Sequence, residues 1–344
     1  MKSSARFLNP SEAARRLGVS AKALRLYEQR GLVAPRRTAA GWRTYGPDEM
    51  ARAAEIVALR ALGLSLSQVA RVTGGDPEDL VPALAAHQTT LEGRMRQLAG
   101  MVEKVRGLRA DLARGKPPAD GELAQLLGAT VERGVAFDLP WPWGGERFEL
   151  RDVRPLNYII GPLGSGKTQL AQRLAETLPG AKFLGLERLA DGGAAAQAQL
   201  DADPALKSRV DRTLAWLVDD GAVASPALTA LLVGLQAENA AILVVDMVEQ
   251  GLDQVAQEAL IAHLRHRGPD SRPLFLLTRS SAILDLTAVG AGEAILLCPA
   301  NHSPPTRVAP FPGAPGYEAV ATCLASPEVR ARTEGFIAWK PQAA

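Results

Sequence analysis

The sequence predicts a multi-domain chain with a mostly α-helical front part and an α/β back part. Three observations support this fold class. A pattern of two short helices and a turn begins near residue 10, apolar residues recur at heptad spacing between 79 and 115, and a glycine-rich loop at 161–168 separates an apolar strand from a helix. With 344 residues, the chain is long enough for two hydrophobic cores.

Two short helices are expected at the front of the chain. Ser11 precedes the helical stretch 12–17 and is the predicted N-cap of the first helix. After the turn 18–20, Ser20 is the predicted N-cap of a second helix over 21–30, and Gly31 is expected to end it. Two short helices joined by such a turn form a helix-turn-helix, whose second helix enters the major groove of DNA.

Six side chains follow from this pattern as predicted DNA contacts. Residues 33–38 and 42–45, on either side of Gly41, are expected to form a two-stranded hairpin, or wing. Guanidinium groups there would hold backbone phosphates. The predicted contacts are Lys22, Arg25 and Tyr27 on the exposed side of the second helix, and Arg36, Arg37 and Arg43 of the wing.

The segments 23–32, 41–45 and 59–66 resemble the winged-helix core of the MerR family. The resemblance runs from about Pro10 to Gly74, and it departs from the family at Leu26, where an aromatic residue is usual. It implies that Tyr45 also approaches double-stranded DNA. It further implies that the partner is a promoter operator, which the family bends and untwists so that RNA polymerase can engage it.

The front part is also basic. Residues 1–115 hold 19 Lys and Arg against 11 Asp and Glu, a net charge of +8, whereas the rest of the chain carries −6. A polyanionic partner accounts for this asymmetry, and so do solvated helices of unequal charge. The chain has two cysteines, and no signal-type segment or membrane-length apolar run is evident in its sequence. We therefore expect a cytoplasmic, nucleoid-associated protein without membrane contact.

A long helix is expected over 79–115. Its apolar residues step by four and three over three heptads, which is the spacing of a coiled-coil seam. These residues are Leu91, Met95, Leu98, Val102, Val105 and Leu112. In the MerR family such a helix pairs antiparallel in a homodimer, while packing on its own domain is the alternative. No cysteine follows the helix, so the resemblance disfavours metal sensing, and 116–130 is predicted to be a linker.

The residues 161–168 fit the pattern G-x-x-x-x-G-K-S/T between a strand at 156–160 and a helix at 168–178. This is the phosphate loop of P-loop NTPases, in which backbone N–H groups and the helix dipole hold phosphates. The predicted nucleotide ligands in it are Gly161, Gly164, Ser165, Gly166, Lys167 and Thr168. Lys167 would reach the β- and γ-phosphates and Thr168 would bind Mg²⁺, so the cofactors are ATP, or another NTP, and Mg²⁺.

The apolar strand 241–245 ends in Asp246, a Walker B pattern, so Asp246 is the second predicted Mg²⁺ ligand. The run from 246 to 253 resembles ABC-type ATPases, in which a glutamate directly follows that aspartate. Met247 stands there instead, so the enzyme assignment stays open and is at most a slow ATPase. Glu249, and Arg279 after a third strand at 273–277, are the remaining catalytic candidates; Arg279 is equally well a surface residue.

The predicted domains are a DNA-binding domain at 1–78, the coiled coil, the linker, a P-loop domain at 131–300 and a C-terminal extension at 301–344 without an assigned role. Trp141 or Trp143, between two expected edge strands, would stack on adenine or pack in the core. The predicted function is a dimeric, nucleotide-responsive MerR-like transcription regulator. The alternatives are a DNA-associated ATPase that uses the winged helix for targeting and, with less support, a kinase fold fused to a regulator.

Overall fold

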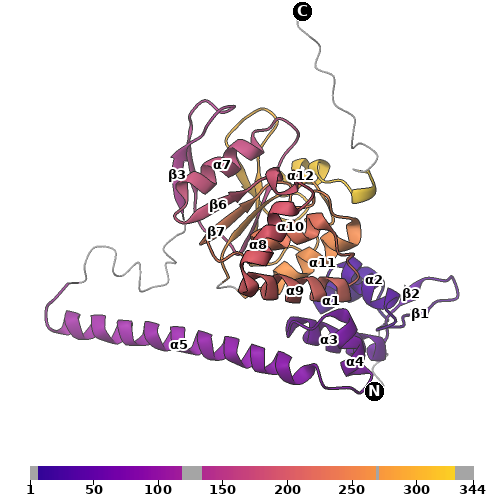
Figure 1. The fold of residues 1–344 in the computed structure, drawn as a ribbon. Coiled ribbons are helices and arrows are strands. Elements are labelled where there is room, and N and C mark those ends of the chain that lie inside the picture. Colours follow the sequence, from indigo (N-terminus) through magenta and orange to yellow (C-terminus); the bar gives the residue numbers. More distant parts are fainter. Residues whose placement is uncertain (1–6, 118–133, 269–270, 330–344) are drawn as a thin grey trace, which may run out of the picture. The chain divides into compact units, whose positions relative to one another are not determined.

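The computed structural model describes residues 7–117, 134–268 and 271–329. It divides into two compact units (Figure 1). The first unit comprises Met1–Gly134 with Leu150–Val153, and the second comprises Val135–Glu149 with Arg154–Ala344.

The first unit contains the predicted helix-turn-helix and wing. Ser20 Oγ accepts a hydrogen bond from the Ala23 N–H at 3.0 Å, as expected of an N-cap. The elements are α1 (Pro10–Leu17), α2 (Ala21–Gln29), β1 (Arg36–Arg37), β2 (Arg43–Thr44), α3 (Pro47–Ala61) and α4 (Leu66–Thr73). β1 and β2 are antiparallel, and the N-terminal Leu8 bridges to Tyr45 beyond the end of β2.

The predicted N-cap of the first helix is wrong. Asn9 caps α1, because its side chain accepts from the Glu12 N–H at 2.9 Å while the Glu12 carboxylate accepts from the Asn9 N–H at 3.1 Å. This reciprocal pair is a capping box, and Pro10 supplies the first helical residue with its φ already fixed. Ser11 therefore lies inside the first turn.

The long helix is α5, Leu80–Ala113, of 34 residues. All six seam residues named above are exposed, with exposed fractions between 39% and 68%. The alternative in which this seam packs on the chain's own domain therefore does not hold among the described residues. Most of the predicted linker, from residue 118 on, lies outside the described residues.

The second unit is built on a six-stranded sheet in the order β10-β9-β5-β8-β7-β6. Five strands are parallel, namely β5 (Leu156–Ile160), β6 (Ala181–Leu184), β7 (Ile242–Val245), β8 (Leu274–Leu277) and β9 (Glu293–Leu297). Every residue of β5, β7 and β8 is buried, which is typical of parallel strands with both faces covered.

Helices and a small hairpin complete this unit (Figure 1). The helices are α7 (Lys167–Thr177), the short η1 (Leu186–Leu189), α8 (Ala194–Ala202), α9 (Pro204–Asp219), α10 (Pro226–Gln236), α11 (Gln254–Arg265) and α12 (Tyr317–Cys323). The two predicted edge strands are β3 (Val135–Asp138) and β4 (Arg147–Leu150), which pair with each other in a separate sheet.

The predicted boundary at residue 300 cuts through this domain. β10 (Thr306–Val308) is antiparallel to β9, and Val320 of α12 is fully buried in the core of the sheet domain. Residues 301–329 are therefore part of the domain and not an extension. Three strand residues among prolines give no periodic signal, so the sequence did not reveal β10. No helix in the described ranges is long and apolar enough to cross a membrane.

Candidate nucleotide site and DNA-binding surface

The phosphate loop, residues 161–168, connects the end of β5 to α7. Gly164 and Gly166 adopt left-handed conformations with φ of 80° and 87°. A Cβ on Gly166 would also lie 2.6 Å from the Trp143 ring, and one on Gly161 would collide with the carbonyl oxygen of Cys298. These positions admit only glycine, so the backbone can curl as a phosphate cradle requires.

Lys167 begins α7 at the centre of the loop. Its Nζ donates to the carbonyl oxygen of Pro162 at 2.6 Å and to Ser165 Oγ at 3.5 Å. Burial lowers the pKa of this ammonium group, and the charge of Arg279 lowers it further. A buried cation bound to neutral oxygens gains strongly from an arriving anion, so the residues present fit a nucleotide phosphate.

Thr168 and Asp246 meet at the carboxyl ends of the strands. Thr168 Oγ1 donates to Asp246 Oδ2 at 3.4 Å, although the two residues are far apart in the sequence. β8 lies between β5 and β7, and all three strands run in the same direction, so their carboxyl ends share one edge. Burial raises the pKa of Asp246 against the lowering effect of Arg188. A hydroxyl and a carboxylate side by side suit Mg²⁺.

Met247 follows Asp246 with a left-handed φ of 42°, which is unusual for a residue with an unbranched apolar side chain. Arg188 of η1 fixes the backbone here, donating to the carbonyl oxygens of Asp246 at 2.9 Å and Met247 at 2.8 Å. Sequence reasoning missed Arg188, because it lies far before the Walker B strand and belongs to no motif.

Glu249 and Arg279 also lie at this edge. Glu249 is buried, and its Oε1 accepts from the backbone N–H of Arg279 at 2.9 Å. One carboxylate oxygen of the predicted base is thus engaged by the backbone that follows β8. The Arg279 side chain lines a cavity together with Pro162 and Leu163 of the phosphate loop, so it lies next to the loop and not on a remote surface.

Of the two tryptophans proposed for adenine, Trp143 packs in the core. It is 4% exposed, its ring lies against Gly166, and its Nε1 donates to the carbonyl oxygen of Ser303 at 3.0 Å. Trp141 is 81% exposed and remains available for a base. The loop after β9 also reaches the phosphate loop, since His302 Nε2 lies 3.1 Å from the Gly164 carbonyl oxygen, a contact without any signal in the sequence.

The predicted DNA contacts divide into two groups. Lys22 and Arg25 on α2 are exposed, as is Arg37 on the wing, whose Nη1 donates to the Gly41 carbonyl oxygen at 3.1 Å. Tyr27 and Tyr45, by contrast, are 6% and 0% exposed and belong to the core of the first unit. The predicted exposed side of α2 is therefore wrong at Tyr27, which lies one turn after buried Leu24 on the same face.

The other two arginines are engaged by carboxylates. Arg43 Nη1 contacts Glu28 Oε2 at 2.8 Å, and the Tyr45 hydroxyl donates to the other oxygen of Glu28. Arg36 Nε contacts Glu49 Oε1 at 2.9 Å. Glu28 thereby ties the wing to α2, a role that sequence reasoning missed because it depends on a contact between distant segments.

Fold and site define a helix-turn-helix head with a wing, followed by an α/β domain that carries a phosphate loop between a parallel strand and a helix. The model for the MerR HTH family regulatory proteins matches residues 8–75. A probable heavy metal-dependent transcriptional regulator from Haemophilus influenzae is 35% identical over 105 residues, which cover 28% of this chain and 82% of that protein. The chain belongs to the MerR family.

Two solved structures are similar in part. HiNmlR, a MerR family regulator lacking the sensor domain and bound to promoter DNA, is 22% identical with a TM-score of 0.24, covering 32% of this chain and 92% of its own. The SMC head domain from Thermotoga maritima is 10% identical with a TM-score of 0.37, covering 51% of this chain and 98% of its own.

Proposed function

We propose that this protein is a dimeric, nucleotide-responsive transcription regulator of the MerR family. In this proposal the winged helices of two chains hold double-stranded promoter DNA, and ATP with Mg²⁺ in the second unit changes how the DNA-binding heads are presented. RNA polymerase is then the indirect partner through the promoter, and the protein acts in the cytosol at the nucleoid.

The observation that carries the proposal is a mismatch in the nucleotide site. The residues that would bind phosphate and Mg²⁺ are present, but the residue that would activate water for hydrolysis is missing. Lys167, Thr168 and Asp246 converge at one edge of the sheet. The position directly after Asp246, from which a carboxylate would activate water, holds a thioether on a left-handed backbone. Loss of a water-orienting group typically slows phosphoryl transfer by orders of magnitude. Binding without rapid turnover suits a switch better than a motor.

The roles of the individual residues follow from their positions. Lys167 would bind the β- and γ-phosphate oxygens, while Thr168 and Asp246 would hold Mg²⁺, which neutralises phosphate charge when bound. Trp141 offers an exposed ring for the base, and Arg279 a fixed cation beside the loop. Lys22, Arg25 and Arg37 offer exposed cations to DNA.

The exposed seam of α5 supports the dimer. Six apolar side chains at heptad spacing remain in solvent in the single chain. Pairing with the same helix of a second chain would bury them in the manner of a coiled coil. The domain limits of the proposal are a DNA-binding domain at 1–78, a dimerisation helix at 79–115 and a nucleotide domain that includes β10 and α12.

The free energy needed to deform promoter DNA is within the range that a bound nucleotide can provide. Bending and untwisting a promoter costs on the order of 1–6 kcal/mol by elastic estimates. A nucleotide can bias two DNA-bound states by that amount only if its affinities for them differ by roughly 10²–10⁴-fold. Association of the two nucleotide domains around ATP is the step that would provide such a difference.

The test is a binding titration on a duplex that the protein selects from a random-sequence library. DNA affinity is measured without nucleotide, with ADP, with ATP and with a non-hydrolysable ATP analogue, each with Mg²⁺. We expect ATP and the analogue to change the affinity equally, and Lys167→Ala to remove the change. An affinity that no nucleotide alters would overturn the proposal.

The second candidate is a DNA-associated ATPase that uses the winged helix for targeting. It is favoured by the burial of Glu249 at the site and by its contact with the backbone of Arg279. Phosphate release measured in the same samples separates the two. Rapid, DNA-stimulated release that Glu249→Gln removes, with DNA binding altered by ATP but not by the analogue, would favour the ATPase.

A further inference from the structure

A cavity of about 430 Å³ lies in the second unit, away from the phosphate loop. Its lining comes from α9, from α10 and the segment between α10 and β7, from α11, and from Arg267 and Arg272 in the segment between α11 and β8. These segments meet at the amino ends of β7 and β8, whereas the phosphate loop lies at the carboxyl ends of the parallel strands. Leucines of α10 and α11 form the apolar part of the lining.

Three arginines line this cavity, namely Arg209, Arg267 and Arg272, and they differ in how their N–H groups are used. Arg272 is a structural cap, because it donates to the carbonyl oxygens of Ala237 at 2.6 Å and of Gly234 at 3.4 Å, and also to that of Leu235 at the end of α10. Such bonds satisfy the last carbonyls of a helix.

Arg267 is different. Its guanidinium donates to the carbonyl oxygen of Arg272 at 2.8 Å, and among the described residues this is its one hydrogen-bond acceptor. A guanidinium carries five N–H donors. Burial, together with the neighbouring charge of Arg272, lowers the pKa of Arg267 to about 10. Arg267 is thus a half-buried cation with most of its N–H donors turned to no acceptor among the described residues.

The lining carboxylate of the cavity is paired with Arg209 and not with Arg267. Glu238 is the one carboxylate among its described lining residues, and its side chain is 78% exposed. It forms an ion pair with Arg209 Nη1 at 3.5 Å, while Arg209 Nε donates to the Gln236 carbonyl oxygen at 3.3 Å; no ion pair joins it to Arg267. His263 adds a further basic side chain to the lining.

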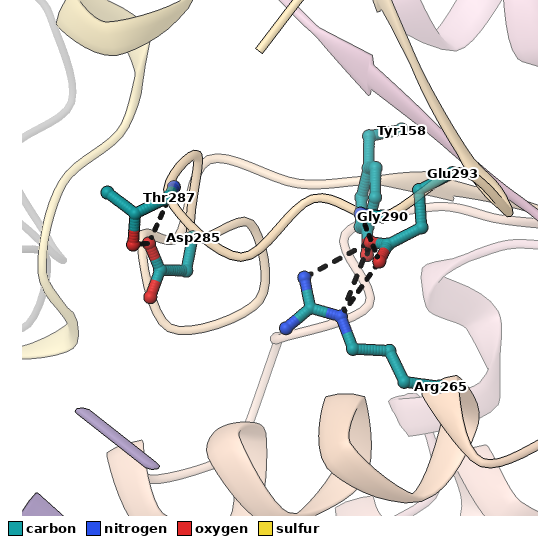
Figure 2. A network of polar contacts seen from close by, with 6 residues as sticks. All are labelled: Tyr158, Arg265, Asp285, Thr287, Gly290 and Glu293. Carbon is teal, nitrogen blue, oxygen red and sulfur yellow. Dashed lines mark hydrogen bonds and ion pairs between the residues drawn. The ribbon is translucent and has the colours of Figure 1, made fainter. Parts of the chain in front are cut away.

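A neighbouring arginine shows what a neutralised site looks like in this domain. Arg265, at the end of α11, contacts the Glu293 carboxylate through Nε at 3.1 Å and Nη2 at 3.1 Å, and Tyr158 donates to the same carboxylate at 2.6 Å (Figure 2). The fold thus supplies a buried anion to Arg265 and none, among the described residues, to Arg267 two residues later.

We propose that this cavity binds a small organic oxyanion, a carboxylate or a phosphate on a short apolar body, through Arg267 and Arg209. The planar N–H forks of two arginines match both oxyanions, and the leucines would cover the apolar body. The volume is within the range of small-molecule sites. This second ligand would bind independently of the nucleotide, at the other end of the sheet.

The experiment uses the full chain, and the fluorescence of Trp216 is the signal. The Trp216 ring lies 4.9 Å from the His263 ring, so its fluorescence responds to a ligand beside His263. Phenyl phosphate, benzoate and inorganic phosphate are the anionic probes, and benzyl alcohol is the neutral one. We expect saturable changes with phenyl phosphate or benzoate, weaker binding of inorganic phosphate, and no change in Trp216→Phe. Isothermal calorimetry gives the affinities.

Two variants decide the assignment. Arg267→Gln should weaken binding about tenfold or more, because it removes charge-assisted hydrogen bonds. Arg212→Gln, which removes an exposed charge one turn from Arg209 on α9, should leave it unchanged. Lys167→Ala should also leave it unchanged, which separates this site from the phosphate loop.

Equal affinities in Arg267→Gln and Arg212→Gln would overturn the proposal. So would benzyl alcohol binding as well as benzoate, or loss of binding in Lys167→Ala. Asp270, the nearest carboxylate in the sequence, lies outside the described residues. Asp270→Asn should leave the affinity unchanged or raise it, and a loss of binding in that variant would contradict an anion at Arg267.

Discussion

The phosphate loop and the DNA-binding head are both predicted to hold phosphates, but their predicted residues differ in placement. Those of the loop lie together, whereas some of those of the head are buried. Lys167 and Thr168 follow the glycine turns of the loop, and Asp246 lies beside them as expected. On the DNA-binding unit, Tyr27 and Tyr45 are core residues instead. The difference teaches that a phosphate loop is a property of local backbone, whereas a DNA-facing side chain depends on which face of its element is left exposed.

Tyr45→Ala should have the largest effect. Removing a fully buried aromatic ring should destabilise the first unit by about 3 kcal/mol or more. Hydrogen exchange of the α1–α4 peptides in the full chain measures the loss of protection. Arg25→Ala, at an exposed position, is the control and should leave protection unchanged. If Tyr45→Ala kept full protection and lost only DNA affinity, Tyr45 would be a contact residue after all.

Lys167→Ala should abolish stabilisation of the second unit by ATP and Mg²⁺. At a nucleotide concentration about 100 times Kd, binding stabilises a folded domain by about 2.7 kcal/mol. Thermal unfolding with and without nucleotide gives the shift in Tm. Lys182→Ala, which removes an exposed lysine from β6, should retain it. A shift that survives in Lys167→Ala would refute the phosphate loop as the nucleotide site.

Arg37→Ala should lower the salt dependence of DNA binding by about one unit of log K per log salt, because it removes one phosphate contact. Arg36→Ala should change this slope less, since its guanidinium is bound to Glu49. Affinities between roughly 50 and 200 mM salt on two unrelated duplexes provide the slopes. A loss confined to one duplex would mean that Arg37 reads bases.

Asp246→Asn should have the smallest effect on stability, a gain of about 1 kcal/mol or less at pH 7, together with loss of the nucleotide response. Burial raises the pKa of Asp246 in the folded protein, so its charge opposes folding at pH values above that raised pKa. The penalty shrinks as pH falls from the raised folded pKa to the unfolded value near 4, and it is lost below that value, where the carboxyl is neutral in both states. Urea unfolding at pH 7 and near pH 4 tests this. A variant less stable than the parent at pH 7 would contradict the buried-charge argument.

Prediction from sequence succeeded where the signal is local. Ser20, Gly31 and the strands around Gly161 and Asp246 are recognisable because caps, left-handed turns and apolar runs act within a few residues. It failed where partners are distant. Arg36 and Arg43 look like solvated cations, and only the fold reveals that Glu49 and Glu28 hold them.

The sequence by itself determined the MerR-type head, the exposed heptad seam and the phosphate loop, because each depends on short-range spacing and backbone conformation. The tertiary structure decided the rest. It placed β8 between β5 and β7 so that Thr168 meets Asp246, bound Arg188 to the backbone around Met247, and added β10 to the sheet. It also left Arg267 in a cavity without a carboxylate among its described contacts. These features depend on contacts between distant segments, whose energies appear only when the chain is packed.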